Sequence, residues 1–146
     1  MMEYVTVFFS ILGGLVIGSA VNLSLIMVSG SIIAPPEGTD VTTMEGLVAA
    51  LPLFEPKHFL FPFLAHALGT LVGSLIAVYF TSNKNTKLFC ALCVGAFFFV
   101  GGIANVLRLP SPLWFSACDL GLAYLPISYA VGRFCFAPQK LCGKSN

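Results

Sequence analysis

Four long runs of hydrophobic residues, separated by short polar segments, dominate the pattern along the chain. They cover about residues 5–28, 59–80, 88–107 and 112–134. A helix of about 20 apolar residues crosses ~30 Å of hydrocarbon, whereas a lone strand would leave its backbone groups unpaired in lipid. The pattern therefore predicts an all-α membrane protein whose residues 1–146 form a single transmembrane domain, a bundle of four transmembrane helices. Pro126 predicts a kink in the last run, because it removes a helical hydrogen bond.

The longest polar segment, residues 30–58, joins the first two runs. Two successive prolines give its first part an extended, turning backbone. Thr42 and Glu45 then have the S/T-x-x-E spacing of a capping box, which predicts a short apolar helix over about residues 43–51. We expect this interfacial helix to lie on the membrane surface or to cap the bundle.

Composition supports the membrane assignment. Of the 146 residues, 58% are hydrophobic and only 9% are charged, with a mean hydropathy of +0.95, whereas about a quarter of a soluble domain is charged. This small number of charges could not cover a water-facing surface. We therefore expect the lipid bilayer to surround much of the chain. The net charge of +1 and the lack of a basic run give no sign of a nucleic-acid partner.

The positions of Lys and Arg predict the orientation. Five of the seven basic residues lie on the side of the two termini: Lys84, Lys87, Arg133, Lys140 and Lys144. Cytoplasmic loops carry an excess of such residues. We therefore expect a bacterial inner (cytoplasmic) membrane protein with its N-terminus and its tail, residues 135–146, in the cytoplasm and the loop 30–58 outside.

Glycines at helix-contact spacing favour close packing between helices. The first two runs each have a G-x-x-x-G pair, Gly14 with Gly18 and Gly69 with Gly73, and the third run has the adjacent glycines Gly101 and Gly102. The partner helix can belong to the same chain, to a second copy in a homo-oligomer, or to a larger membrane complex.

A faint internal repeat also relates the two halves of the chain. The spacing of phenylalanine, alanine and glycine in residues 63–69 recurs in residues 115–121, and a glycine-to-asparagine spacing in residues 18–22 recurs in residues 101–105. The bundle could therefore consist of two duplicated helical hairpins.

Strongly polar residues are rare within the runs, and they gather in the outer half of the predicted bundle, while the inner half is mainly Gly, Ala and Phe. They are Asn22, His66, Asn105 and Asp119, with Arg108 at the outer end of the third run. A carboxylate in hydrocarbon is costly unless it is paired, so we expect Asp119 to pair with Arg108 or His66. The cluster either bonds helices together or forms a protonatable site open to the outside, since histidine titrates near neutral pH.

Glu55, Lys57 and His58 lie where the second run enters the membrane, and we interpret them as an interfacial anchor. A metal site is not expected here, because eight residues separate His58 from His66, or ~12 Å along a helix.

The cysteines include a C-x-x-C pair, Cys90 and Cys93, at the predicted cytoplasmic end of the third run. Cys135 and Cys142 lie on the same side, and Cys118 lies in the outer half. The cytosol keeps thiols reduced, so ordinary buried thiols are favoured over a four-cysteine metal site. We therefore expect no metal and no cofactor.

Three segments carry a resemblance: I-A-P-P-E-G-T-D at residues 33–40, E-P-K-H at residues 55–58 and F-L-A-H-A-L-G at residues 63–69. In these the chain resembles a group of small bacterial four-helix inner-membrane proteins. The resemblance implies a bacterial origin and four spans, and it brings no function with it.

Two functions follow from these features. The first is an accessory or structural membrane subunit, a self-associating helix bundle that works through its helix faces. The alternative is a small channel or transporter for a proton, a cation or a small solute, using the polar layer of Asn22, His66, Asn105 and Asp119. An enzyme is least favoured, because no nucleophile–base pair or cofactor motif is visible.

Overall fold

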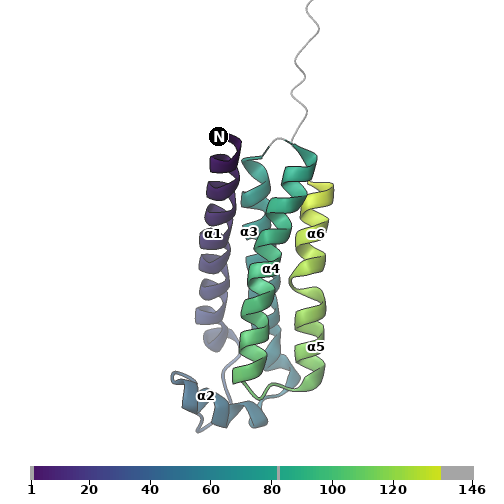
Figure 1. The fold of residues 1–146 in the computed structure, drawn as a ribbon. Helices are drawn as coiled ribbons and strands as arrows, with labels where there is room; N and C mark the ends of the chain where they lie inside the picture. The colour runs from purple at the N-terminus through teal and green to yellow at the C-terminus, as the bar shows by residue number, and fades with distance from the viewer. Residues whose placement is uncertain (1, 82, 136–146) are drawn as a thin grey trace, which may run out of the picture.

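The computed structural model describes residues 2–81 and 83–135, and in these ranges it contains helices and no strand. The helices are α1 (Met2–Ile32), α2 (Met44–Ala50), α3 (Leu60–Tyr79), α4 (Lys84–Arg108), α5 (Leu113–Leu122) and α6 (Leu125–Phe134), with short 3-10 helices η1 (Leu51–Leu53) and η2 (Pro56–Phe59). Figure 1 shows α1, α3 and α4 running along the bundle, α5 and α6 stacked end to end beside α4, and α2 lying across one end. We call this the α2 end and the opposite one the N-terminal end.

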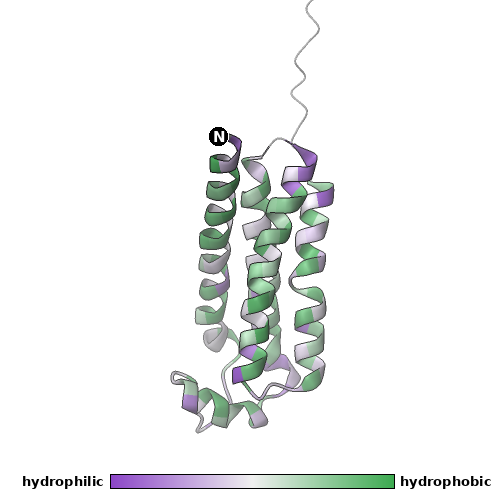
Figure 2. Cartoon of the chain, viewed as in Figure 1, coloured by the Kyte–Doolittle hydropathy of each residue, from purple (hydrophilic) through white to green (hydrophobic). Residues whose placement is uncertain are grey.

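Among the described residues, three helical segments are long and apolar enough to cross a membrane: Glu3–Ile32, Pro56–Tyr79 and Lys84–Arg108. Their apolar side chains also point outward. On α1, for example, Phe8 and Phe9 are 62% and 63% exposed. Exposed apolar side chains of this kind suit lipid and not water, and Figure 2 shows hydrophobic residues along the length of the bundle. By length and composition, these helices indicate a membrane protein.

The first helix is longer than the sequence predicted. α1 has 31 residues, or ~46 Å at ~1.5 Å per residue, and exceeds the expected range 5–28 at both ends. It is longer than ~30 Å of hydrocarbon requires, so it either tilts or extends beyond the lipid.

The fourth predicted run, residues 112–134, is not one helix. It breaks after Leu122, and α5 and α6 have 10 residues each, or ~15 Å, too short to span alone. Pro126 lies in the first turn of α6, where its missing N–H cannot extend the preceding helix. Tyr124, with φ −118° and ψ −84°, lies outside helical geometry. The kink expected at this proline is therefore a full break.

Glycines allow α1 and α3 to approach each other closely. A Cβ built on Gly73 would lie 2.7 Å from the carbonyl oxygen of Gly14, and one on Gly69 would lie 2.9 Å from that of Gly18. Gly101 is different, since a Cβ there would meet no described atom within 4 Å. On α4, Gly95 and Gly102 have close neighbours whereas Gly101 has none, so only the second glycine of the predicted pair at 101–102 serves in packing.

The residues matched by the internal repeat lie in unlike surroundings. Ala65 is fully buried whereas Ala117 is exposed. Gly69 packs on α1, but a Cβ on Gly121 would meet no described atom within 4 Å. The duplication of two hairpins stays a prediction from sequence alone.

The predicted loop helix exists as α2, within a residue of its expected start. Its N-cap is Thr43, whose hydroxyl accepts a hydrogen bond from the backbone N–H of Gly46 at 3.0 Å. Thr42 instead donates its hydroxyl and backbone N–H to Asp40, and these two bonds lower the pKa of that carboxyl. The capping box predicted from Thr42 and Glu45 is therefore wrong, because the N-cap lies one residue later, at Thr43, and the residue three positions after it is Gly46.

Candidate functional site

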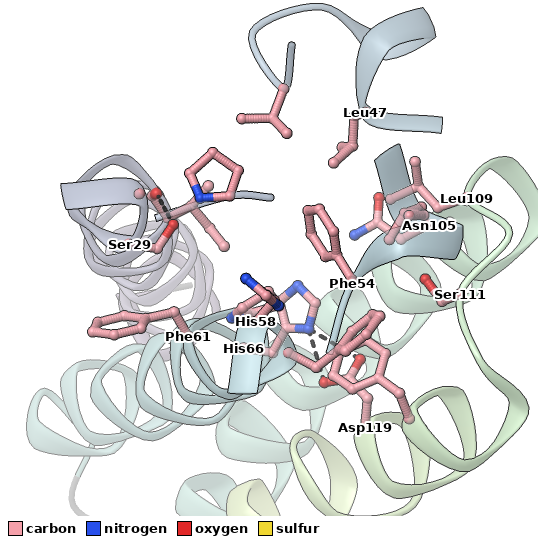
Figure 3. Close-up of a pocket in the computed structure, with 18 of the residues that line it drawn as sticks. Ser29, Leu47, Phe54, His58, Phe61, His66, Asn105, Leu109, Ser111 and Asp119 are labelled. Atoms are coloured by element: carbon pink, nitrogen blue, oxygen red, sulfur yellow. Dashed lines mark hydrogen bonds and ion pairs between the residues drawn. The ribbon is translucent and has the colours of Figure 1, made fainter. Parts of the chain in front are cut away.

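A cavity of about 510 Å³ lies inside the α2 end of the bundle. Its walls come from α1, α3, α4 and α5, and α2 and η1 lie over it. The four polar residues that the sequence placed at one depth all line it, one from each wall helix: Asn22, His66, Asn105 and Asp119. Figure 3 shows His66 and Asp119 on one side of this cavity, Asn105 on another, and Leu47 reaching in from α2.

Asp119 is the centre of the polar contacts. It is 3% exposed, and its Oδ1 and Oδ2 lie 2.9 Å and 3.0 Å from Nδ1 of His66. The hydroxyl of Tyr124 donates to Oδ2 at 2.8 Å. Of the two partners that the sequence offered for Asp119, the structure selects His66. Arg108 lies exposed at the end of α4 and forms no ion pair with it.

The ionisation state of Asp119 decides which nitrogen of the His66 ring carries the hydrogen. An ionised carboxylate only accepts hydrogen bonds, so Nδ1 must donate to Asp119. In the neutral ring Nε2 is then an acceptor, and it bonds to no other group in the described part of the chain. Because His66 lines the cavity, the Asp119–His66 pair presents a proton acceptor with a fixed orientation.

Tyr124 reaches Asp119 because of the break between α5 and α6. In a continuous helix, residues five apart point about 140° away from each other, at ~3.6 residues per turn. The non-helical backbone at Tyr124 turns its side chain back toward Asp119. Gly102 makes room for the ring, since a Cβ there would lie 2.7 Å from the Tyr124 hydroxyl. Sequence analysis missed Tyr124 because it counted as an ordinary aromatic residue; Pro126 two residues later was the available signal.

Below the cavity, the same face of α3 stays polar. Thr70 and Ser74 follow His66 at helical spacing, and both are fully buried. Their hydroxyls have no hydrogen-bond partner among the described residues. Ser128 of α6 is fully buried too. The expectation of an inner half made mainly of Gly, Ala and Phe therefore overlooked a column of buried hydroxyl groups.

The expected interfacial anchor has a more specific role. Glu55 and Lys57 form an exposed ion pair of 3.0 Å, a type of pair that contributes little stability. His58 does more, because its Nδ1 accepts from the backbone N–H of Glu55 at 2.9 Å and its Nε2 lies 3.1 Å from the carbonyl oxygen of Ala34. It thereby ties the start of the loop to η2, over the cavity that it also lines.

Within residues 2–81 and 83–135, no group of three His, Cys, Asp or Glu side chains is arranged to hold a metal ion. The described cysteines, Cys90, Cys93, Cys118 and Cys135, are free thiols. Cys142, Lys140, Lys144 and the tail from residue 136 onward lie outside the described residues. Comparison of the chain with protein-family models, curated proteins and solved structures finds no match in any of the three.

Proposed function

We propose that the protein is a small transporter or channel for a proton, a cation or a small solute in a bacterial inner membrane. In this proposal α5 and α6 together form the fourth crossing, the α2 end faces out, and both termini are cytoplasmic. The observation that carries it is the buried Asp119 carboxylate, held by His66 and Tyr124 at the wall of the cavity.

A carboxylate within a membrane-spanning bundle usually marks a pathway or a proton relay. Here the unused nitrogen of His66 can accept a proton from the cavity, and Asp119 at 2.9 Å stabilises the resulting imidazolium. Removal of the proton restores the neutral ring. The pair can therefore load and release one proton without a change of helix packing.

The column of buried hydroxyls supports the passage of a proton beyond the cavity. Thr70 and Ser74 extend ~12 Å from His66 toward the N-terminal end, at ~1.5 Å per residue. Buried hydroxyls without protein partners are the groups that internal waters bind. Together they supply hydrogen-bonding positions where a purely structural core would be apolar.

The accessory-subunit function remains a second prediction. The exposed apolar face of α1 suits lipid and a partner helix equally, so it does not favour a homo-oligomer or a larger complex. A stable co-purifying partner in mild detergent would support this alternative, whereas a clean monomer would count against it.

Proton flux through reconstituted vesicles tests the proposal. Vesicles containing the protein, a trapped pH-sensitive dye and a potassium ionophore receive an inward pH gradient. We expect the intact protein to dissipate the gradient well above empty vesicles, and Asp119→Asn to abolish this flux, because the amide cannot stabilise a protonated His66.

A matched control is Glu45→Gln on the exposed start of α2, which makes the same chemical change away from the cavity and should leave the flux intact. Equal flux from Asp119→Asn and the intact protein, or no flux from either under proton or cation gradients, would overturn the proposal.

A further inference from the structure

The wall of the cavity is mostly apolar, with a polar floor of Asn22, His66, Asn105 and Asp119 and with Ser29, His58 and Ser111 elsewhere in the lining. Aromatic side chains (Phe54, Phe59, Phe61 and Phe115) and aliphatic ones surround Asn22, His66, Asn105 and Asp119. A volume of about 510 Å³ falls within the ~300–1,000 Å³ of pockets that enclose small organic ligands. A bare proton or a metal ion needs no apolar wall of this kind, so the ligand has an apolar body.

The charges of the residues that line the cavity exclude a ligand with an anionic headgroup. No Lys or Arg is among the described residues that line the cavity, and its one acidic side chain is Asp119. While His58 and His66 are neutral, a phosphate or carboxylate headgroup would find no cation here and would face a carboxylate. An anion in such surroundings would lose its hydration without a compensating partner.

The polar floor also defines what the headgroup must do. Both oxygens of Asp119 already accept hydrogen bonds, and Nε2 of the neutral His66 ring is an acceptor. A ligand that satisfies this nitrogen therefore brings a donor, such as a hydroxyl or an amine. An ammonium group would add attraction to Asp119 and to the aromatic rings of the wall.

The cavity also lies between α1 and α4 near the α2 end. In the N-terminal half, α1 packs against α4 through contacts that reach Gly18, where a Cβ would lie 3.0 Å from the Phe98 ring. Nearer the α2 end the cavity separates Asn22 and Met27 of α1 from Asn105 of α4. Met27 is 73% exposed and Asn105 is exposed too. A sideways entry for a membrane-dissolved molecule would therefore lie between α1 and α4.

We infer that the cavity binds an amphiphile with a hydroxyl or amine head and no anionic group, taken from the leaflet at the α2 end. This inference rests on the proposed function, because it names the solute that the proposed transporter would carry. The head lies at His66 and Asn105, and the apolar tail lies along the phenylalanine wall.

The single tryptophan provides a built-in reporter. Trp114 lies with its ring centroid 5.6 Å from that of Phe59 and 5.9 Å from that of Phe115, and both phenylalanines line the cavity. Bromine quenches indole fluorescence at short range. The probes are a long-chain alcohol brominated at its tail, the matching amine and the matching carboxylic acid, added to the protein in nanodiscs of neutral lipid at mildly alkaline pH.

We expect the alcohol and the amine to give saturable quenching above the linear quenching from bulk lipid, with at least about tenfold lower apparent affinity for the carboxylate, the factor that one lost hydrogen bond represents. His66→Ala should lower the apparent affinity for the alcohol by about tenfold, because it also removes one hydrogen bond. Asn105→Ala changes an exposed position, so the fold should tolerate it, and it should also lower the affinity for the alcohol. Asn85→Ala, near the N-terminal end, should leave that affinity unchanged.

Three results would each overturn the inference. They are an affinity for the carboxylate equal to that for the alcohol, linear quenching by all three probes, and saturable quenching that neither His66→Ala nor Asn105→Ala changes. These outcomes are separable from the proposed function. Proton flux lost on Asp119→Asn without amphiphile binding refutes this inference alone, whereas selective amphiphile binding without any flux refutes transport and leaves the ligand class standing.

Discussion

The contact between Gly102 and Tyr124 gives the sharpest test of the site geometry. A methyl group at Gly102 would lie 2.7 Å, 2.8 Å and 2.9 Å from the Oη, Cζ and Cε2 atoms of Tyr124. Unstrained Cβ atoms do not approach other atoms this closely, so in Gly102→Ala the tyrosine must move. Its hydrogen bond of 2.8 Å to Asp119 would then lengthen or break.

Two effects determine how much Gly102→Ala lowers the free energy of unfolding. Overpacking a well-packed interior destabilises by about 1–3 kcal/mol, and a hydrogen bond to a charged acceptor contributes about 1.5–3 kcal/mol. They involve the same side chain and are not additive, so we expect Gly102→Ala to lower the free energy of unfolding by about 2–4 kcal/mol. The flux in the vesicle assay should fall as well.

The adjacent position supplies the control. In Gly101→Ala the same methyl group would meet no described atom within 4 Å, and alanine favours the helix by up to about 1 kcal/mol over glycine. Unfolding by detergent titration, followed by circular dichroism, compares the two variants. If Gly102→Ala proved as stable as Gly101→Ala, the described position of Tyr124 would be wrong.

A double-mutant cycle separates the clash from the hydrogen bond. Tyr124→Phe removes the closest atom, so Gly102→Ala should destabilise that background less than it destabilises the intact protein. The two ring carbons remain, so the relief should be partial. Strictly additive effects would contradict a direct contact between the two residues.

Three further predictions follow from other contacts. Gly73→Ala places a methyl group 2.7 Å from the carbonyl oxygen of Gly14, and it should destabilise the α1–α3 contact by about 1–3 kcal/mol in the same unfolding assay. His58→Ala removes the link to Ala34, and a loss of about 1 kcal/mol should speed proteolysis of the loop before α2 by about fivefold if cleavage follows local opening. Thr70→Val removes a buried hydroxyl to which no described residue bonds, so it should change the free energy of unfolding by no more than about 1 kcal/mol while it reduces proton flux.

Each of these has a matched control in the chain. Gly13→Ala meets only Ile76, at 3.9 Å, and should be tolerated where Gly73→Ala is not. Lys57→Ala alters an exposed ion pair beside His58 and should leave proteolysis unchanged. Thr81→Val deletes a buried hydroxyl that donates to the carbonyl of Val78 at 3.0 Å, so it should destabilise. A reversed order within any pair would contradict the contact on which it rests.

The sequence was sufficient for the elements that depend on local composition. Apolar runs of membrane-spanning length define α1, α3 and α4, because helix length in lipid follows from the thickness of the hydrocarbon. The short helix α2 was also visible, since capping residues act within one turn. Its exact cap was not, because Thr42 and Thr43 both carry hydroxyls and only the turn at Asp40 decides which one binds the helix.

The sequence also located the polar groups of the cavity, because polar residues within apolar runs are few and their depth can be counted along a helix. It could not determine the partners. Whether Asp119 meets His66 or Arg108 depends on how α3, α4 and α5 rotate against one another, and no local pattern encodes that rotation. Tyr124 escaped notice for a related reason, since its direction depends on the break before Pro126.

By itself, the sequence thus determined that the chain is helical, that it suits a membrane, and that its few polar groups belong to one depth. These properties follow from the period and length of apolar segments, which act residue by residue. Only the tertiary structure decided that Gly102 and not Gly101 faces a neighbour, that Asp119 bonds to both His66 and Tyr124, and that a cavity lies beside them. Those facts depend on side-chain volumes from helices far apart in the chain, and they exist only once the helices have packed.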